Sequence, residues 1–433
     1  MEKKKSIFSY YKPYKKIFFA DMFFAIMASI ITLVIPLVVR YITSTVIYYE
    51  TDEAFRVILK LGLMMTVLIL FQCYCNYFIA NYGHVMGAKI EYDMRAEIFA
   101  HYQKLPFSFY DNQKVGQLLS RITSDLFDIT ELLHHGPENV VISAMKFIGA
   151  FVILFTISPK LTFAAFALIP FMFLYAWFFN RKMKKAFARN RVKIADINAQ
   201  IEDNLSGIRV VKSFANESVE EEKFKVGNDG FLAAKKDSYL YMGGYHSGLT
   251  AFINMITVIV LVTGGILITK AQVSVTDLVT FLLYISIMTD PVRTMIDFAE
   301  MFQNGYSGYE RFQEILAIEP DIQDSQGSEE LTDVKGTIDF ENVSFQYEEN
   351  TEKVLSHIDL HVDAGEYLAL VGSSGAGKTT LCNLIPRFYD VTGGSIKVDG
   401  KDVRDLTLKS LRDHIGIVQQ DVYLFVGTVY DNI

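Results

Sequence analysis

Nine consecutive residues near the C-terminal end of the sequence contain the eight-residue pattern G-x-x-x-x-G-K-[ST] and one further threonine after it. They are Gly372, Ser373, Ser374, Gly375, Ala376, Gly377, Lys378, Thr379 and Thr380. Glycines let backbone N–H groups turn toward phosphate oxygens, and the N-terminus of a following helix favours negative charge. Lys378 is expected to reach the β and γ phosphates, and the Thr379 hydroxyl to ligate Mg²⁺. The pattern therefore predicts a phosphate loop that binds ATP with Mg²⁺.

The residues around this loop have the setting that the motif requires. Tyr367–Val371 is an apolar run that predicts a buried strand, and the segment 381–385 predicts a helix. Further β-branched stretches predict strands over 337–345, 354–362 and 415–418. We therefore expect an α/β domain to hold the loop.

Six apolar stretches precede this domain, and each is long enough to cross a bilayer as a helix of roughly 18 to 25 residues. They lie near 17–39, 57–80, 140–157, 161–179, 249–268 and 278–300. Buried helices of a large soluble protein are the alternative, but they would need several helices that are apolar all round. We predict an all-α six-helix transmembrane domain over residues 1–318, a linker over 319–336, and a partial α/β phosphate-loop nucleotide-binding domain over 337–433.

Positive charge predicts how the spans are oriented. The connection from Arg181 to Lys236 holds 13 Lys and Arg residues, whereas the connections after spans three and five hold only Lys160 and Lys270. Because Lys and Arg accumulate on the cytoplasmic side, the N-terminus, the long connections and the nucleotide-binding domain are expected in the cytoplasm. The predicted location is the cell membrane, crossed several times.

The two long connections, 81–136 and 181–245, keep helical spacing and few breakers. They are expected to be helices that extend beyond the bilayer. Each is interrupted once, at 105–111 and at 206–214, where a short transverse element fits.

Charged residues also occur at the end of the sixth span. Asp290, Arg293 and Asp297 share one helix face by their spacing of three and seven residues. A charge near the bilayer centre costs about 2.5–3.5 kcal/mol on insertion scales. Asp290 and Arg293 could therefore line a substrate pathway or form a structural ion pair at the cytoplasmic edge, and the sequence leaves both readings open.

Composition excludes some classes of protein. The 433 residues are 51% hydrophobic and carry a net charge of −8, which argues against a nucleic-acid partner bound through a basic field. The three cysteines have no metal-ligand spacing. The sequences His134-His135 and Gly83-His84 show no carboxylate or cysteine at useful spacing, so they predict solvated helix faces and not a metal site.

Two further segments, taken with the six spans and the loop, resemble the ATP-binding cassette (ABC) exporters over the whole chain. Tyr347 matches the aromatic residue that stacks on adenine in that family, and Gln420 matches the glutamine that senses Mg²⁺ and the γ phosphate. The segments 106–111, with Val115-Gly116-Gln117, and 206–214 are similar to the family's coupling regions. Fused membrane and ATP-binding domains in this order are typical of the exporters.

The resemblance implies a half-transporter that works with a second subunit, as a homodimer or heterodimer, in contact with membrane lipid. It implies outward transport of a hydrophobic or amphipathic substrate (a lipid, drug or peptide) driven by ATP binding and hydrolysis. The family's signature loop, its aspartate-ending strand with the catalytic glutamate, and its switch histidine find no match, so no catalytic residue is predicted. We therefore expect a truncated ATP-binding domain. The alternative is a hydrolysis-incompetent membrane protein that binds nucleotide weakly or is inert.

Overall fold

The computed structural model describes residues 5–111, 113–347, 352–419 and 423–432. The chain divides into two compact units. The helical unit consists of residues 5–93 and 125–309, and the phosphate-loop unit consists of residues 94–124 with 310–433. Each unit is described by itself below.

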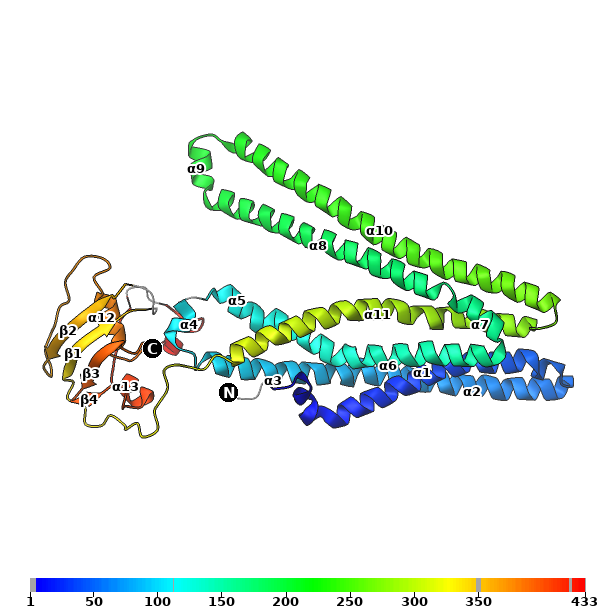
Figure 1. Cartoon of the computed structure of the whole chain (residues 1–433), viewed down its shortest axis with the longest axis horizontal. Helices are drawn as coiled ribbons and strands as arrows, with labels where there is room; N and C mark the ends of the chain where they lie inside the picture. Colours follow the sequence, from blue (N-terminus) through cyan, green and yellow to red (C-terminus); the bar gives the residue numbers. More distant parts are fainter. Residues whose placement is uncertain (1–4, 112, 348–351, 420–422, 433) are drawn as a thin grey trace. The chain divides into compact units, whose positions relative to one another are not determined.

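The elements follow one another as long helices and then short strands (Figure 1). The α-helices are α1 Lys15–Ser44, α2 Thr51–Phe78, α3 His84–Tyr102, α4 Phe107–Asp111, α5 Val115–Ser120, α6 Leu126–Ile157, α7 Pro159–Phe166, α8 Ile169–Ser206, α9 Ile208–Ser213, α10 Glu217–Thr269, α11 Val275–Leu316, α12 Lys378–Leu384 and α13 Leu408–Asp413. The strands are β1 Ile338–Phe345, β2 Leu355–Val362, β3 Gly393–Val398 and β4 Lys401–Asp402. Short 3-10 turns occupy Ile7–Tyr14, Val46–Tyr48 and Tyr430–Asn432, and π-helical turns occupy Ile79–Gly83 and Arg121–Asp125.

Six stretches of helix in the described chain are long and apolar enough to cross a membrane, as the sequence predicts. They also confirm the extensions. At 1.5 Å per residue the 53 residues of α10 span about 80 Å, well beyond a hydrocarbon core of about 30 Å. The short transverse elements are present as well, because α4 falls within 105–111 and α9 links the ends of α8 and α10 (Figure 1).

The ends of the apolar helices carry recognisable stop and start signals. Ser158 separates α6 from α7, and its hydroxyl accepts a hydrogen bond from the backbone N–H of Leu161. Pro159 follows at the first helical position, where its missing N–H costs nothing. Two residues therefore suffice to turn the chain back for another span.

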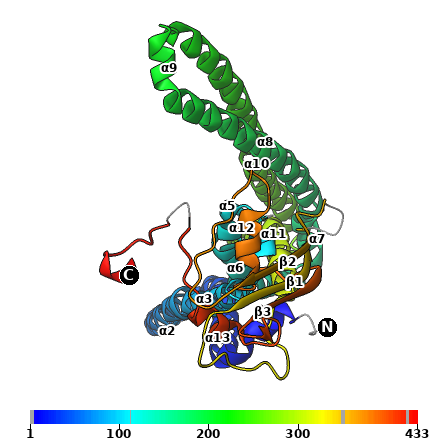
Figure 2. The same ribbon diagram turned by 90° about the vertical axis from the view of Figure 1, so that its left-hand side faces the viewer.

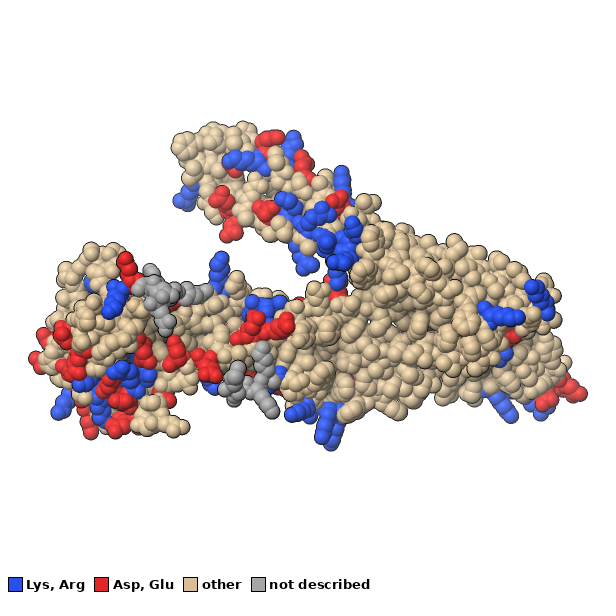
Figure 3. All heavy atoms as spheres, in the orientation of Figure 1, with Lys and Arg blue, Asp and Glu red and all other residues tan. Residues whose placement is uncertain are grey.

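The main core of the helical unit is built by faces of five of its helices. Its buried side chains come mainly from α6, α7, α8, α10 and α11, and include Leu154, Leu161, Met172, Ile256 and Tyr284. Many large apolar side chains on the outer faces are exposed, and Figure 3 shows a broad surface with few charged residues over these helices. Such a surface suits lipid, because hydrocarbon chains are as apolar as the side chains that face them.

The phosphate-loop unit contains a four-stranded antiparallel sheet in the order β2-β1-β3-β4. In the central strand β1, Ile338 pairs with both Val362 and Val398. Helix α12 packs Leu381 and Leu384 into the core beside the sheet (Figure 2). This small core therefore fixes the position of α12, whose N-terminus lies at the end of the phosphate loop.

Two predicted strands are wrong in the structure. Residues 367–371 and 415–418 form no strand, and Tyr367, Val371 and Val418 are fully or almost fully exposed. An apolar run becomes a buried strand only where neighbouring strands pair with it. No segment of the described residues pairs with either run, so their apolar character alone does not form a strand.

Candidate nucleotide-binding site

The phosphate loop is described in full between residues 372 and 380. Gly375 and Gly377 have positive φ angles of 82° and 84°, in the left-handed region that favours glycine. A Cβ at Gly377 would also lie 2.8 Å from the Leu355 side chain of β2. The loop path therefore needs glycine at 377 both for its backbone angle and for its close approach to the sheet.

Lys378 is the cationic group of the loop. Its Nζ donates hydrogen bonds to the carbonyl oxygens of Gly372 and Ser373, at 2.9 and 2.8 Å. The ammonium group therefore lies inside the curve of the loop. Thr379 beside it is exposed, so its hydroxyl is accessible to a cation, whereas Thr380 is buried.

Tyr347 lies beside the loop although it precedes Thr380 by 33 residues in the chain. The two hydroxyl groups are 2.9 Å apart. The ring makes edge-on contacts with Phe345 and Tyr389, with centroids 4.9 and 5.2 Å away, and the residue stays 44% exposed. Because other rings contact Tyr347 at its edge and the residue is partly open to solvent, a planar base could stack on its face. Adenine stacking on Tyr347 therefore stays a prediction, and the geometry is suitable for it.

In the same unit, two aromatic residues that follow the loop helix, Phe388 and Tyr389, contact the first transverse helix, α4. Phe388 stacks on Phe107 of α4 with centroids 4.3 Å apart, and the Tyr389 hydroxyl donates to Asp111 Oδ2 at 2.6 Å. Burial, followed by the hydrogen bond to Asp111, raises the pKa of Tyr389 well above its ordinary value. The phenol therefore remains a proton donor at neutral pH.

These contacts form one continuous series of side chains. It starts at Thr380 on α12, passes through the rings of Tyr347 and Tyr389, and ends at Asp111 on α4. Sequence reasoning marked the two ends, the phosphate loop and the segment 105–111, but missed Tyr389. The only available signal was its place in the aromatic pair that follows the loop helix.

Other predicted site residues lie elsewhere. Gln420 is outside the described residues. Asp290 and Arg293 belong to the helical unit, where both are exposed. Neither forms a close ion pair within the part of the chain that the structure describes, and the role of both residues stays a prediction.

One expectation about the histidines is wrong. His134 is buried, with 3% of its surface exposed, and carboxylates do lie close to it. Glu138 Oε2 is 4.0 Å from His134 Nε2, and Asp21 of α1 belongs to the same group of side chains. The spacing of four residues from His134 to Glu138 on one helix was a visible signal, whereas Asp21 is brought there only by helix packing.

Comparison with known proteins now identifies the class. The family model described as ABC transporter transmembrane region matches residues 18–292, and the family model described as ABC transporter matches residues 355–432.

Curated relatives match along the whole chain. The ABC transporter ATP-binding protein YwjA of Bacillus subtilis, described as uncharacterized, is 40% identical over 429 residues, which are 99% of this chain and 74% of the relative. YgaD of the same organism, whose name provisionally describes a multidrug export ATP-binding/permease protein, is 30% identical with the same coverage. A Staphylococcus aureus protein with a name of the same kind is 31% identical over 433 residues, which are 75% of its length.

The helices and the phosphate loop therefore define a multi-pass membrane protein of the ABC transporter family. Within that family the chain belongs to the exporters in which the membrane domain is fused to the ATP-binding domain.

Proposed function

We propose that this chain is the subunit of an ATP-driven exporter that moves a hydrophobic or amphipathic molecule, such as a lipid, drug or peptide, out of the cell. The main support for this proposal is the series of contacts from Thr380 through Tyr347 and Tyr389 to Asp111. It joins the predicted ATP site to the predicted coupling helix α4. ATP that binds one arrangement of this series more tightly than another shifts the population of the helices attached to α4.

The nucleotide site is proposed to hold ATP with Mg²⁺. Lys378 would contact the β and γ phosphates, the backbone N–H groups of the loop would surround them, and Thr379 would ligate Mg²⁺ together with Gln420. The exposed Thr379 hydroxyl supports this assignment. The N-terminus and the ATP-binding domain are proposed to be cytoplasmic. The connection after span four is rich in Lys and Arg, which accumulate on the cytoplasmic side, and the N-terminus and the ATP-binding domain lie on the same side of the six spans as this connection.

A second half-transporter, identical or different, is proposed as the partner. The second transverse helix, α9, belongs to the helical unit, and the side chains of Val210 and Phe214 at this helix are exposed. Exposed apolar side chains at a predicted coupling segment support a contact with another subunit, since a single chain leaves them uncovered.

The substrate class is proposed from the helical unit. An apolar cavity of about 610 Å³ lies among α6, α8 and α11, with Phe147, Phe173 and Met295 in its wall. Pro291 and Val292, which lie between the exposed residues Asp290 and Arg293 in the chain, also line it. An amphipathic molecule would place its apolar part against this wall and its charged part near Asp290 or Arg293. This arrangement supports the proposal that Asp290 and Arg293 belong to the substrate pathway.

Inside-out membrane vesicles test this function, with residues 1–433 joined to the part of a relative's ATP-binding domain that supplies the signature loop and the catalytic glutamate. We expect ATP with Mg²⁺ to drive accumulation of a hydrophobic cationic dye, and neither a non-hydrolysable ATP analogue nor ATP without Mg²⁺ to sustain it. The variant Asp290→Asn should reduce uptake of the cationic dye more than uptake of a neutral one. If no dye, lipid or peptide accumulates while ATP still binds, export is excluded and the nucleotide-binding, non-transporting candidate takes its place.

Residues 1–433 contain no match to the family's signature loop or to its catalytic glutamate. We therefore propose that the purified polypeptide of residues 1–433 binds ATP without hydrolysing it. ATP turnover by this polypeptide that disappears in Lys378→Ala would contradict the proposal.

Replacing Tyr347 by alanine is expected to weaken ATP binding about fivefold, since stacking on adenine contributes on the order of 1 kcal/mol. Tyr347→Phe keeps the ring and loses only the hydroxyl near Thr380, so it should bind ATP almost as the native chain does. Inorganic triphosphate has no base and provides the control: its competition with a fluorescent ATP analogue should be the same in all three proteins. An equal loss of triphosphate binding in Tyr347→Ala would show that the ring supports the loop and does not contact the base.

A further inference from the structure

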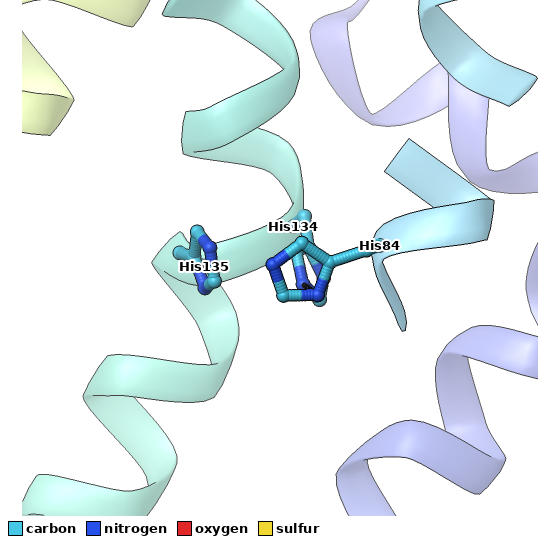
Figure 4. Close-up of side chains that lie close together, drawn as sticks. All are labelled: His84, His134 and His135. Atoms are coloured by element: carbon cyan, nitrogen blue, oxygen red, sulfur yellow. Dashed lines mark hydrogen bonds between the residues drawn. The ribbon is translucent and has the colours of Figure 1, made fainter. Parts of the chain in front are cut away.

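A cluster of histidines and carboxylates lies inside the helical unit, away from the phosphate loop. His134, His135 and Glu138 come from α6, His84 from the start of α3, and Asp21 from α1. Figure 4 shows His84 approaching His134 and His135 from the neighbouring helix. Three helices therefore bring metal-ligand side chains to one place.

The centre of this cluster is buried, and several of its polar atoms have no hydrogen-bond partner among the residues that the structure describes. Asp21 has 0% of its surface exposed, and among the residues that the structure describes neither of its carboxylate oxygens has a hydrogen-bond partner. The Nδ1 atom of His134, which is 3% exposed, also has none. A buried carboxylate without a partner is costly, and nearly all buried polar groups in proteins have one. A cation bound at His134 Nε2 would place positive charge beside both groups.

The backbone is shaped around the same two side chains. A π-helical turn at Ile79–Gly83 interrupts the helix between α2 and α3, and such turns often occur at functional sites. A Cβ at Gly83 would lie 2.4 Å from His134 Cε1 and 2.9 Å from Asp21 Oδ1. Only glycine at 83 leaves room for both the imidazole and the carboxylate.

The distances between the candidate ligand atoms suit a small metal ion. His84 Nδ1 lies 3.2 Å from His134 Nε2, and His135 Nδ1 lies 3.4 Å from Glu138 Oε2. A third separation, from His134 Nε2 to Glu138 Oε2, is 4.0 Å, and the candidate ligand atoms of His84, His134 and His135 all lie within 4.8 Å of one another. Ligands at about 2.0–2.1 Å from a tetrahedral Zn²⁺ are about 3.3 Å apart. Two of these separations match that value, and small side-chain movements would bring the third to it.

We propose that the helical unit binds one divalent transition metal ion of the zinc class, with His84, His134, His135 and Glu138 as ligands. Imidazole nitrogens favour Zn²⁺ and its neighbours over Mg²⁺ and Ca²⁺, which prefer oxygen. Glu138 and Asp21, the two least exposed carboxylates of the cluster, balance the two positive charges of the ion, whereas Glu131 lies at the more exposed side.

The remaining carboxylates lie beside the imidazole rings and would orient them once a metal is bound. Asp21 lies on the Nδ1 side of His134, near the point where a Cβ of Gly83 would stand. Glu131 Oε2 lies 3.7 Å from His135 Nε2, so His135 can present Nδ1 to the metal while Nε2 faces a carboxylate. Carboxylates that orient metal-bound histidines in this way typically account for about 10- to 100-fold in metal affinity. The bound ion would fasten α1, α3 and α6 together.

The test uses the full chain, purified in detergent without a polyhistidine tag and stripped with a chelator. We expect calorimetric titration to give one Zn²⁺ per chain, Co²⁺ to give the visible spectrum of a four-coordinate site, and Zn²⁺ to raise the Tm. His84→Gln and Glu138→Gln should each weaken Zn²⁺ binding at least about tenfold. His84 is exposed, so its replacement should leave folding intact, which the Tm of the stripped variant checks.

Asp21→Asn and His246→Gln complete the design. Asp21→Asn should weaken the affinity while keeping the stoichiometry and the Co²⁺ spectrum, because Asp21 positions a ligand. His246 is an exposed histidine of α10 outside the cluster, so His246→Gln should bind Zn²⁺ like the native chain. Absence of saturable Zn²⁺ binding, or equal binding by native chain, His84→Gln and Glu138→Gln, would overturn the proposal.

Discussion

Lys378→Ala is expected to weaken ATP binding by about 10- to 100-fold, the largest effect of any single change at the nucleotide site. A hydrogen bond to a charged group contributes about 1.5–3 kcal/mol, and Lys378 is the one cation that the phosphate loop motif supplies. Its Nζ already lies against the loop carbonyls of Gly372 and Ser373, where a triphosphate would be surrounded. Titration of the purified chain with a fluorescent ATP analogue measures the loss.

Lys409→Ala is the matched control for this variant. Lys409 belongs to α13 of the same unit, is 85% exposed at its side chain, and makes an ordinary ion pair with Asp413 at 2.6 Å. Its removal changes the net charge by the same amount and should leave ATP binding unchanged. If both lysine variants lose affinity equally, the effect is one of overall charge, and the loop is not the ATP site.

Phe107→Ala combined with Tyr389→Phe is expected to reduce ATP-driven dye accumulation about 10- to 100-fold while ATP affinity stays the same. These changes remove the stacking of Phe107 on Phe388 and the hydrogen bond from Tyr389 to Asp111. Coupling between two sites typically amounts to about 1–3 kcal/mol, and these two contacts join α4 to the sheet side of the unit. Tyr389→Phe keeps the ring that touches Tyr347, so the ATP site itself is left in place.

The single variants and a control variant distinguish a loss of coupling between the ATP site and α4 from a general loss of protein function. If the two contacts act together, the double variant should lose less than the product of the two single losses. Phe55→Ala, which truncates an exposed aromatic at the start of α2, should transport normally. Normal transport by the double variant, or a parallel fall in ATP affinity, would contradict a coupling role for this contact.

Much of this protein was predictable from short stretches of sequence. The six apolar stretches predict six membrane helices because a bilayer requires about 20 apolar residues in a row, whatever the rest of the chain does. The interruptions near Pro106 and Gly207 predict the short helices α4 and α9 for a similarly local reason, since proline and glycine break helices. The phosphate loop is equally local, as its positive φ angles fall at Gly375 and Gly377.

Local patterns failed where a partner far along the chain decides the outcome. The apolar run 367–371 predicts a strand, yet no described segment pairs with it and Val371 is exposed. The sequence around His134 predicts a solvated helix face. Helix packing instead buries His134 beside Asp21, which is more than a hundred residues away in the chain. Hydrogen-bond pairing and burial depend on neighbours in space, which periodicity along one segment does not specify.

The sequence by itself thus determined the membrane spans, the phosphate loop and the family resemblance, because each depends on residues that are close together in the chain. Only the tertiary structure decided that Tyr347 lies beside Thr380, that Tyr389 reaches Asp111 of α4, and that helices α1, α3 and α6 form one histidine–carboxylate cluster. The physical reason is the same in all three cases. Side-chain contacts that carry chemistry act over a few ångströms, and packing of the helices and the sheet brings distant residues within that range.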